Sequence, residues 1–248
     1  WWGSGHDKTI NIPCLAVSSD GFDNCNLPAF VGSRIIENPH GGIISIAPAF
    51  GYCRAILYDK NFIKNIKHSI PWKDKKNEII WRGSATGPQN HTNFRIKFCD
   101  LYMDKYNVGI TETWGKWDPK YLKESMTKLD MLKYKYQISF EGNTGSSDII
   151  WKLASNSVVI MKKPILESWT MEGLLKPYIH YVPLKDDLSD LDEIVKWCKD
   201  NDEKCQEIVK NANNFMKQFE NLDNEIKIWK MIQETYKKTF TFTDVPIY

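Results

Sequence analysis

The sequence lacks paired cysteines. Its six cysteines are scattered, and none belongs to a C-x-x-C pair, which is the spacing typical of zinc ribbons and thioredoxin-like redox sites. We therefore expect neither a zinc centre nor dithiol chemistry. We interpret the cysteines as buried thiols of a protein in a reducing compartment.

Long apolar runs and concentrated positive charge are also missing. No apolar stretch approaches the roughly 20 residues that a membrane helix needs, so we expect no membrane span. The net charge is only +2, and the lysine runs at 73–76 and 133–135 are interrupted by acidic or aromatic residues. Proteins that bind nucleic acid usually gather basic residues on one face, so we expect no nucleic-acid partner.

Short apolar runs that alternate with helical patterns are present instead. The expected strands lie at 77–81, 134–140, 158–161 and 179–182. The expected helices lie at 93–106, 190–201, 203–219 and 224–238. This alternation predicts parallel β-α-β units, and hence a doubly wound α/β sheet.

The junction after the strand at 77–81 is rich in groups that bind anions. Glycines let a backbone approach a ligand closely, and hydroxyls, N–H groups and guanidinium groups donate to phosphate oxygens. The candidate ligand-binding residues here are Arg82, Gly83, Ser84, Thr86, Gly87 and, near the start of the next helix, Arg95.

A second junction of the same kind follows the strand at 134–140. Its candidates are Gly142, Gly145, Ser146, Ser147 and, on the following helix, Lys152. Ligands of open α/β sheets bind beyond the carboxyl ends of the strands, where both junctions are predicted to lie. Neither contains a P-loop or a G-x-G-x-x-G fingerprint, so a tight turn without a ligand is the alternative for each one alone.

Taken together, these motifs resemble glycosyltransferase family 90, which includes capsule-associated xylosyltransferases and protein O-glucosyltransferases. The most specific matches are LASNSVV at 153–159 and LKPYIHYVPL at 175–184. Further matches, in the order of the family, lie at 71–73, 81–87, 133–136, 141–142 and 187–202, together with Arg95.

The resemblance implies a GT-B architecture, in which two Rossmann-like domains face each other across a cleft. We expect residues 1–72 to form the acceptor-side domain, incomplete at its N-terminus because the chain starts at Trp1. Residues 73–222 are expected to bind the nucleotide sugar. Residues 223–248 are expected to form a C-terminal helix that packs back on the first domain.

The resemblance also implies an inverting, metal-independent glycosyltransferase that moves a sugar from a UDP-sugar to a glycan hydroxyl. UDP-xylose is favoured as the donor, with UDP-glucose next. Arg95 becomes the expected diphosphate ligand, and Asp130 falls in the nucleoside pocket. Fixed cations and helix N-termini can stabilise a departing diphosphate in place of Mg²⁺, so we expect no metal or other cofactor. The D-x-D sequences at 190–192 and 200–202 lie at expected helix ends, where acids act as caps.

Two features depart from the family pattern. Many relatives carry an arginine where this chain has Asp148, and an acidic side chain cannot hold a diphosphate. Either Lys152 supplies the missing charge from one turn on, or the donor is held differently. The cysteines do not follow the pattern of the secreted O-glucosyltransferases, and the chain ends in VPIY instead of a KDEL-like signal. We therefore expect a cytoplasmic protein, in the host cytoplasm if it is viral.

An inverting transfer needs a base for the proton of the acceptor, and a carboxylate suits that role. By position, Asp7 is the nearest match to the family's aspartate, although the spacing is shorter than in relatives. Asp23 is the alternative, and an aspartate that the pattern does not identify is a third. The imperfect match at Asp7 and the acid at Asp148 keep another function open, that of a noncatalytic nucleotide- or glycan-binding module with the same fold.

Overall fold

The computed structural model describes most of the chain beyond residue 69. The described residues are 30–31, 33–37, 43–44, 70–86, 94–112, 118–142 and 145–239. The predictions for Asp7, Asp23 and Gly87 lie outside these residues, as does most of the expected first domain.

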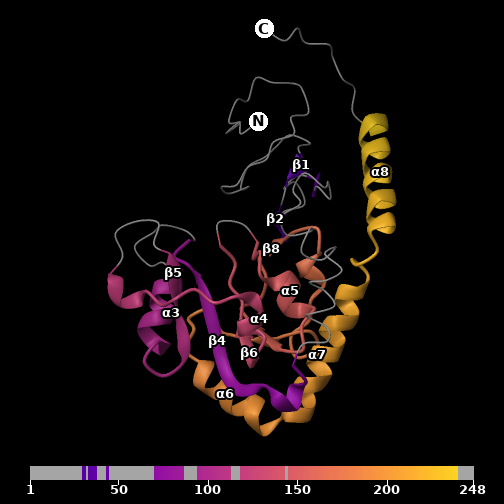
Figure 1. The fold of residues 1–248 in the computed structure, drawn as a ribbon. Helices are drawn as coiled ribbons and strands as arrows, with labels where there is room; N and C mark the ends of the chain where they lie inside the picture. Colours follow the sequence, from indigo (N-terminus) through magenta and orange to yellow (C-terminus); the bar gives the residue numbers. More distant parts are fainter. Residues whose placement is uncertain are drawn as a thin grey trace.

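A five-stranded parallel sheet forms the centre of the described part (Figure 1). Its spatial order is β5-β4-β6-β7-β9. The strands are β4 (Lys76–Ser84), β5 (Asn107–Glu112), β6 (Tyr134–Ile138), β7 (Val158–Met161) and β9 (Val182–Pro183). Parallel pairing throughout confirms the α/β prediction and gives a Rossmann-like arrangement.

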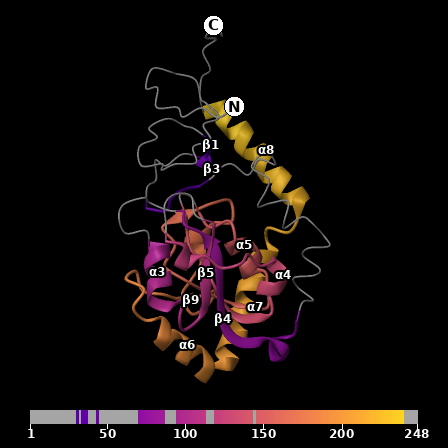
Figure 2. The ribbon, with the colours of Figure 1, turned by 60° about the vertical axis from the view of Figure 1, so that its left-hand side comes forward.

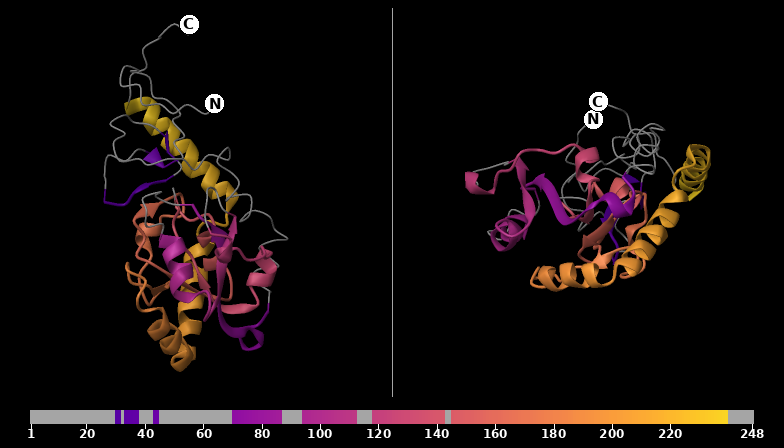
Figure 3. Two further views of the ribbon diagram at one scale, coloured as in Figure 1. Left: turned by 90° about the vertical axis from the view of Figure 1, so that its left-hand side faces the viewer. Right: turned by 60° about the horizontal axis from the view of Figure 1, so that its bottom comes forward.

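Helices cover both faces of this sheet (Figure 3). On one face, α3 (Phe94–Tyr102) and α6 (Leu191–Asp200) pack against the strands. On the opposite face lie α4 (Lys128–Met131) and α5 (Ile149–Leu153). Burial on both faces explains why β4 contains an uninterrupted apolar run in place of an alternating pattern.

Two strand predictions need correction, and one strand was not predicted. Strand β4 continues to Ser84, so Arg82 and Gly83 lie in the strand and not in the turn after it. The strand expected at 179–182 shrinks to Val182–Pro183, because the chain turns at Tyr178, whose φ is +58°. Strand β5 at 107–112 was missed, since a short run interrupted by Gly109 carries little periodic signal.

The helical predictions towards the C-terminus agree closely with the structure. After α6 come α7 (Asp202–Lys217) and α8 (Leu222–Thr239). In Figures 1 and 2, α8 extends beyond the sheet towards β1 (Phe30–Val31) and β3 (Ile43–Ile44), which pair in parallel. None of the described helices is both long and apolar enough to span a lipid bilayer.

One N-terminal segment lies directly against the sheet domain. Strand β2 (Arg34–Ile35) pairs antiparallel with β8 (Leu166–Glu167). Arg34 Nη2 also forms an ion pair with Glu167 Oε1 at 2.7 Å. The remaining short helices are the 3-10 turns η2 (Trp72–Asp74), η3 (Pro119–Tyr121) and η4 (Glu172–Leu174).

Candidate functional site

The strand order contains one switch point. From β4 the chain crosses to β5 on one side, and it then continues to β6 on the other side of β4. Connections therefore leave the carboxyl ends of β4 and β6 in opposite directions and open a crevice between them. Ligands of doubly wound sheets bind at this place, and the two candidate junctions follow these two strands.

The side chain of Arg95 ties the two junctions together. From the start of α3, its Nη1 donates to the carbonyl oxygen of Ser84 and to Thr86 Oγ1, both at 2.9 Å. Its Nη2 donates across the crevice to the carbonyl oxygens of Phe140 at 2.9 Å and Glu141 at 3.0 Å. One planar guanidinium thus holds the ends of β4 and β6 in a fixed relationship.

Gly142 lies against this connection. A β-carbon at Gly142 would stand 3.3 Å from Arg95 Nη2 and 3.4 Å from Thr86 Oγ1, which is closer than most real contacts of that kind. The absence of a side chain therefore lets the second junction approach the first. At position 83, glycine avoids a different clash, because a β-carbon there would meet the indole ring of Trp81 at 2.8 Å.

Asp148 and Lys152 form an ion pair beneath the second junction. The Lys152 side chain is completely buried, and its ammonium also donates to the carbonyl oxygen of Ile138 at 2.6 Å. Asp148 Oδ1 accepts from the hydroxyls of Ser139 and Ser146, each at 2.6 Å. Burial raises the pKa of the Asp148 carboxyl, but Lys152 and these hydroxyls outweigh it and hold that pKa below its ordinary value. Burial lowers the pKa of the Lys152 ammonium, and the charge of Asp148 acts against that shift.

Glu141 links the second junction to the segment after β7. Its Oε1 accepts from the backbone N–H groups of Ile165 at 3.0 Å and Leu166 at 2.9 Å. Burial raises the pKa of the Glu141 carboxyl, and the two N–H donors act in the opposite direction. The carboxylate thus fixes the 165–166 backbone, which continues into β8, next to the Arg95 connection.

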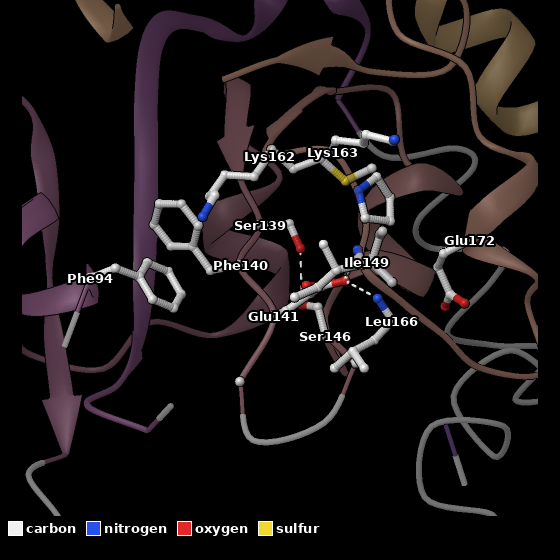
Figure 4. A pocket seen from close by; sticks show the side chains of 15 residues that line it. Phe94, Ser139, Phe140, Glu141, Ser146, Ile149, Lys162, Lys163, Leu166 and Glu172 are labelled. Carbon is white, nitrogen blue, oxygen red and sulfur yellow. Dashed lines mark hydrogen bonds between the residues drawn. The ribbon is translucent and has the colours of Figure 1, made fainter. Parts of the chain in front are cut away.

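A hollow of about 210 Å³ opens at the carboxyl ends of β6 and β7 (Figure 4). Its apolar wall includes Phe94, Phe140, Ile149, Met161, Ile165 and Leu166. Its polar groups include Ser139, Glu141, Ser146, Lys162, Lys163 and Glu172. A mixture of aromatic wall, hydroxyls and charges suits a ligand with both a ring and an anionic group.

A second hollow, of about 220 Å³, lies on the other side of the 163–165 segment. It is bordered by the 35–37 segment at β2 and by Glu172 and Gly173 at η4. Glu172 is buried, and its carboxylate accepts from the hydroxyl of Ser168 at 2.7 Å. The two hollows share Lys163, Pro164, Ile165 and Glu172, so they flank one wall between the sheet domain and the N-terminal segment.

The structure brings several predicted residues together. Arg95, Thr86 and Gly142 are in mutual contact, and Gly142, Gly145 and Ser146 border the first hollow. Ser84 is connected to them through its carbonyl and through its hydroxyl, 3.1 Å from that of Thr86. The predicted convergence of the two junctions is a feature of the fold, and the ligand roles of these residues stay predictions.

Other predicted residues lie apart from this cluster. Arg82 donates to the carbonyl oxygen of Glu124 and to Asn107 Oδ1, on the β5 side of the sheet. Asp130 lies in α4, before the amino end of β6, where it accepts from Thr127 Oγ1 and from Lys133 Nζ. Neither borders either hollow. Ser147 is exposed.

Sequence patterns alone did not predict a site role for Lys162, Lys163, Glu141 or Glu172. A usable signal existed for the two lysines, since they directly follow the predicted strand at 158–161 and its carboxyl end faces the same crevice. Glu141 stood within a matched motif, but its contact with 165–166 depends on tertiary structure. Across the described ranges, no group of three or more His, Cys, Asp or Glu side chains is arranged to hold a metal ion.

Comparisons with known proteins agree with this geometry. The family model described as Glycosyl transferase family 90 matches residues 53–245. O-glucosyltransferase LpsA of Dichelobacter nodosus is 34% identical over 169 residues, which are 67% of this chain and 51% of that protein. Uncharacterized protein 179R of Invertebrate iridescent virus 6 is 30% identical, over 71% of this chain and 18% of its own length.

Human Protein O-glucosyltransferase 1 is more distant, at 26% identity over 69% of this chain and 44% of its own length. The chain therefore spans about half or less of the length of these relatives. The match of the family model covers both junctions, the crevice between them and helix α8. On these grounds, the chain belongs to glycosyltransferase family 90.

Proposed function

We propose that this protein is an inverting, metal-independent glycosyltransferase that transfers a sugar from a UDP-sugar to a glycan hydroxyl. UDP-xylose is the favoured donor, and UDP-glucose is next. The single observation that carries the proposal is that Arg95 connects the two turns at the switch point. Beside this connection lies the hollow whose aromatic wall, hydroxyls and charges suit a ligand with a ring and an anionic group. Membership in the family and the name of LpsA support the reaction class.

In this proposal the donor diphosphate lies over the two connected turns. Thr86, Gly142 and the residues from Gly145 to Ser147 offer hydroxyls and backbone N–H groups, and Arg95 adds a buried positive charge close to Thr86 and Gly142. Charge that develops on a leaving diphosphate is stabilised most strongly by fixed dipoles and cations that need no rearrangement. The hydrogen bonds of Arg95 supply this rigidity.

The proposed arrangement is of the GT-B type, with the acceptor approaching from the N-terminal side. Two observations support it: β2 pairs with β8 beside the hollows, and α8 extends towards β1 and β3. Asp7 is the proposed base, with Asp23 as the alternative. A cytoplasmic setting is supported by Cys99, Cys198 and Cys205, which are buried free thiols.

Calorimetry on the full chain tests the donor. UDP, UDP-xylose, UDP-glucose, ADP and GDP are titrated in EDTA and again with added Mn²⁺. We expect the three uridine compounds to bind in EDTA and the other two to bind much more weakly. Binding that requires Mn²⁺, or no preference for uridine, would contradict the proposal.

A noncatalytic binding module is the second candidate. It is favoured by the Asp148–Lys152 pair, because a buried neutralised pair stands where many relatives carry an arginine. Hydrolysis of UDP-xylose or UDP-glucose distinguishes the two functions. An enzyme is expected to release UDP slowly from one donor, and Asp7→Asn or Asp23→Asn to reduce that release. Tight donor binding without release, in the presence of glycan acceptors as well, would favour the module.

A further inference from the structure

We propose that Lys162 is the side chain that directly contacts the donor diphosphate in this protein. This inference rests on the proposed function and specifies how the site holds its anion. It replaces neither Arg95 nor the two turns, but it assigns the direct ionic contact to a residue after β7 that the sequence motifs did not indicate.

The cations expected from the sequence are committed to other partners. Both terminal nitrogens of Arg95 already donate to protein oxygens, at 2.9–3.0 Å. Lys152 is buried and paired with Asp148. Arg82 donates to Glu124 and Asn107 and does not border the hollow. These three residues can shape the site or its field, but a new direct contact by Lys152 or by the terminal nitrogens of Arg95 would require existing hydrogen bonds to break.

Lys162 borders the same hollow, and its side chain is accessible to a ligand there. Its side chain is 32% exposed, so the ammonium can reach a ligand while part of its stem is held. The ammonium nitrogen lies 5.4 Å from the centre of the Phe94 ring, in cation–π range. The guanidinium carbon of Arg95 lies 6.0 Å from that ring centre. Both cations therefore lie near one aromatic ring of the hollow's wall, and of the two only Lys162 itself borders the hollow. Figure 4 shows Lys162 and Phe94.

The ion pair that Lys162 forms in the structure is a weak one. Its ammonium is 3.2 Å from Asp186 Oδ1, and the Asp186 side chain is 89% exposed. Exposed ion pairs contribute little free energy, whereas a lysine on a phosphate in a partly enclosed site forms a stronger charge-assisted contact. The ammonium can thus exchange Asp186 for a phosphate oxygen at small cost.

Lys163 provides a natural comparison. It also borders the hollow, but its side chain is 83% exposed and its ammonium is 3.9 Å from Glu37 Oε1. Figure 4 shows the two lysines extending in different directions, with only Lys162 over the phenylalanine rings. A general attraction by positive charge would involve both lysines equally, whereas a direct contact involves Lys162 alone.

The test measures the affinity of the full chain for UDP and for uridine. The variants are Lys162→Gln, Lys163→Gln and Lys162→Arg, and calorimetry is performed in EDTA at fixed salt. We expect Lys162→Gln to weaken UDP binding about ten- to a hundredfold, the range for a hydrogen bond to a charged group. Uridine binding should change less than about twofold, because uridine has no phosphate. Lys163→Gln should lower UDP affinity less than about threefold, and Lys162→Arg should retain most of it.

Each other outcome contradicts a specific statement. If the parent protein binds neither UDP nor uridine, the proposed function fails and this inference falls with it. If the parent binds UDP and Lys162→Gln binds it equally well, only the assignment of Lys162 is wrong. Equal losses in the two glutamine variants would indicate general attraction, and equal losses for UDP and uridine would indicate a structural effect. Either result overturns the direct contact.

Discussion

Arg95 and Gly142 meet across the switch point of the sheet. A β-carbon added to Gly142 would come within 3.3 Å of Arg95 Nη2, although the two residues follow different strands. A side chain at position 142 would therefore require the guanidinium or the backbone to shift by a few tenths of an ångström. This close approach connects the geometry of the two turns, and it makes both residues sensitive to substitution.

The first prediction concerns this approach. Gly142→Ala should destabilise the protein by about 1–3 kcal/mol, the usual cost of an inserted methyl group in a filled space, because the hydrogen bonds of Arg95 prevent it from moving aside. Urea unfolding measures the change. Gly145→Ala is the matched control, since a β-carbon there meets nothing within 4 Å, and it should stay within about 0.5 kcal/mol of the parent. Equal stabilities of the two variants would contradict the contact.

The second prediction concerns Arg95. Arg95→Ala should weaken UDP binding by about 2–4 kcal/mol, because it removes a buried charge and strands its acceptors. Arg95→Lys retains the charge but cannot span the Ser84 and Glu141 carbonyls together. We therefore expect Arg95→Lys to recover part of the affinity and little of the lost thermal stability. A loss of UDP affinity below about 0.5 kcal/mol in Arg95→Ala lies within ordinary scatter and would rule out its role at the diphosphate.

The third prediction concerns the acid stability provided by Asp148. Its folded-state pKa is lowered, so it contributes stability that is fully present above its unfolded pKa of about 3.9 and is lost as pH falls through the folded pKa. Asp148→Asn leaves Lys152 buried without its partner, which should cost about 3–5 kcal/mol at pH 7. The stability gap between parent and variant should then narrow below about pH 4.

Urea unfolding at pH 7, 5, 4 and 3 checks this gap. Asp130→Asn is the control, because Asp130 also pairs with a lysine and a threonine hydroxyl but its side chain is 42% exposed. Exposed pairs contribute little, so the control should follow the parent at every pH. A gap for Asp148→Asn that stays constant down to pH 3 would contradict the pKa assignment.

The fourth prediction concerns Lys75, a buried lysine directly before β4. Burial lowers its pKa to about 8, and its ammonium donates to Ser157 Oγ and to the carbonyl oxygen of Leu132. Between about pH 8 and the unfolded pKa of about 10.4, the unfolded chain binds a proton that the folded protein does not. Stability from this residue therefore rises with pH, by up to about 1.4 kcal/mol per pH unit.

The measurement compares parent and Lys75→Met by urea unfolding from pH 7 to pH 10. The stability of the parent relative to the variant should increase above pH 8. Lys73→Met, at an exposed position nearby, should show no such change relative to the parent. A parallel course of parent and Lys75→Met across this range would show that Lys75 titrates like an ordinary lysine.

The sequence predicted most of the central strands and the C-terminal helices, but it did not predict β5 or the turn at Tyr178. The short apolar runs within 77–81 and 158–161 predicted β4 and β7, because a strand buried on both faces favours consecutive apolar residues. The alternating apolar and polar residues at 134–140 predicted β6. The amphipathic patterns likewise predicted α6, α7 and α8, since helical period is a local property. The short β5, with Gly109 in it, and the turn at Tyr178 have no comparable local signal.

The sequence by itself determined the fold class, the family and the two turns of the candidate site, because strand period, turn residues and motif order are written along the chain. Only the tertiary structure decided which cations are already engaged. Arg82 and Arg95 look equally available in sequence, yet their partners include Asn107 and Phe140, which folding brings beside them. Lys152 pairs with Asp148 one helical turn earlier, and only the tertiary structure buries its side chain. A charge can contact a ligand directly only where the protein has not already supplied its partners, and that depends on the pairing of distant segments in space.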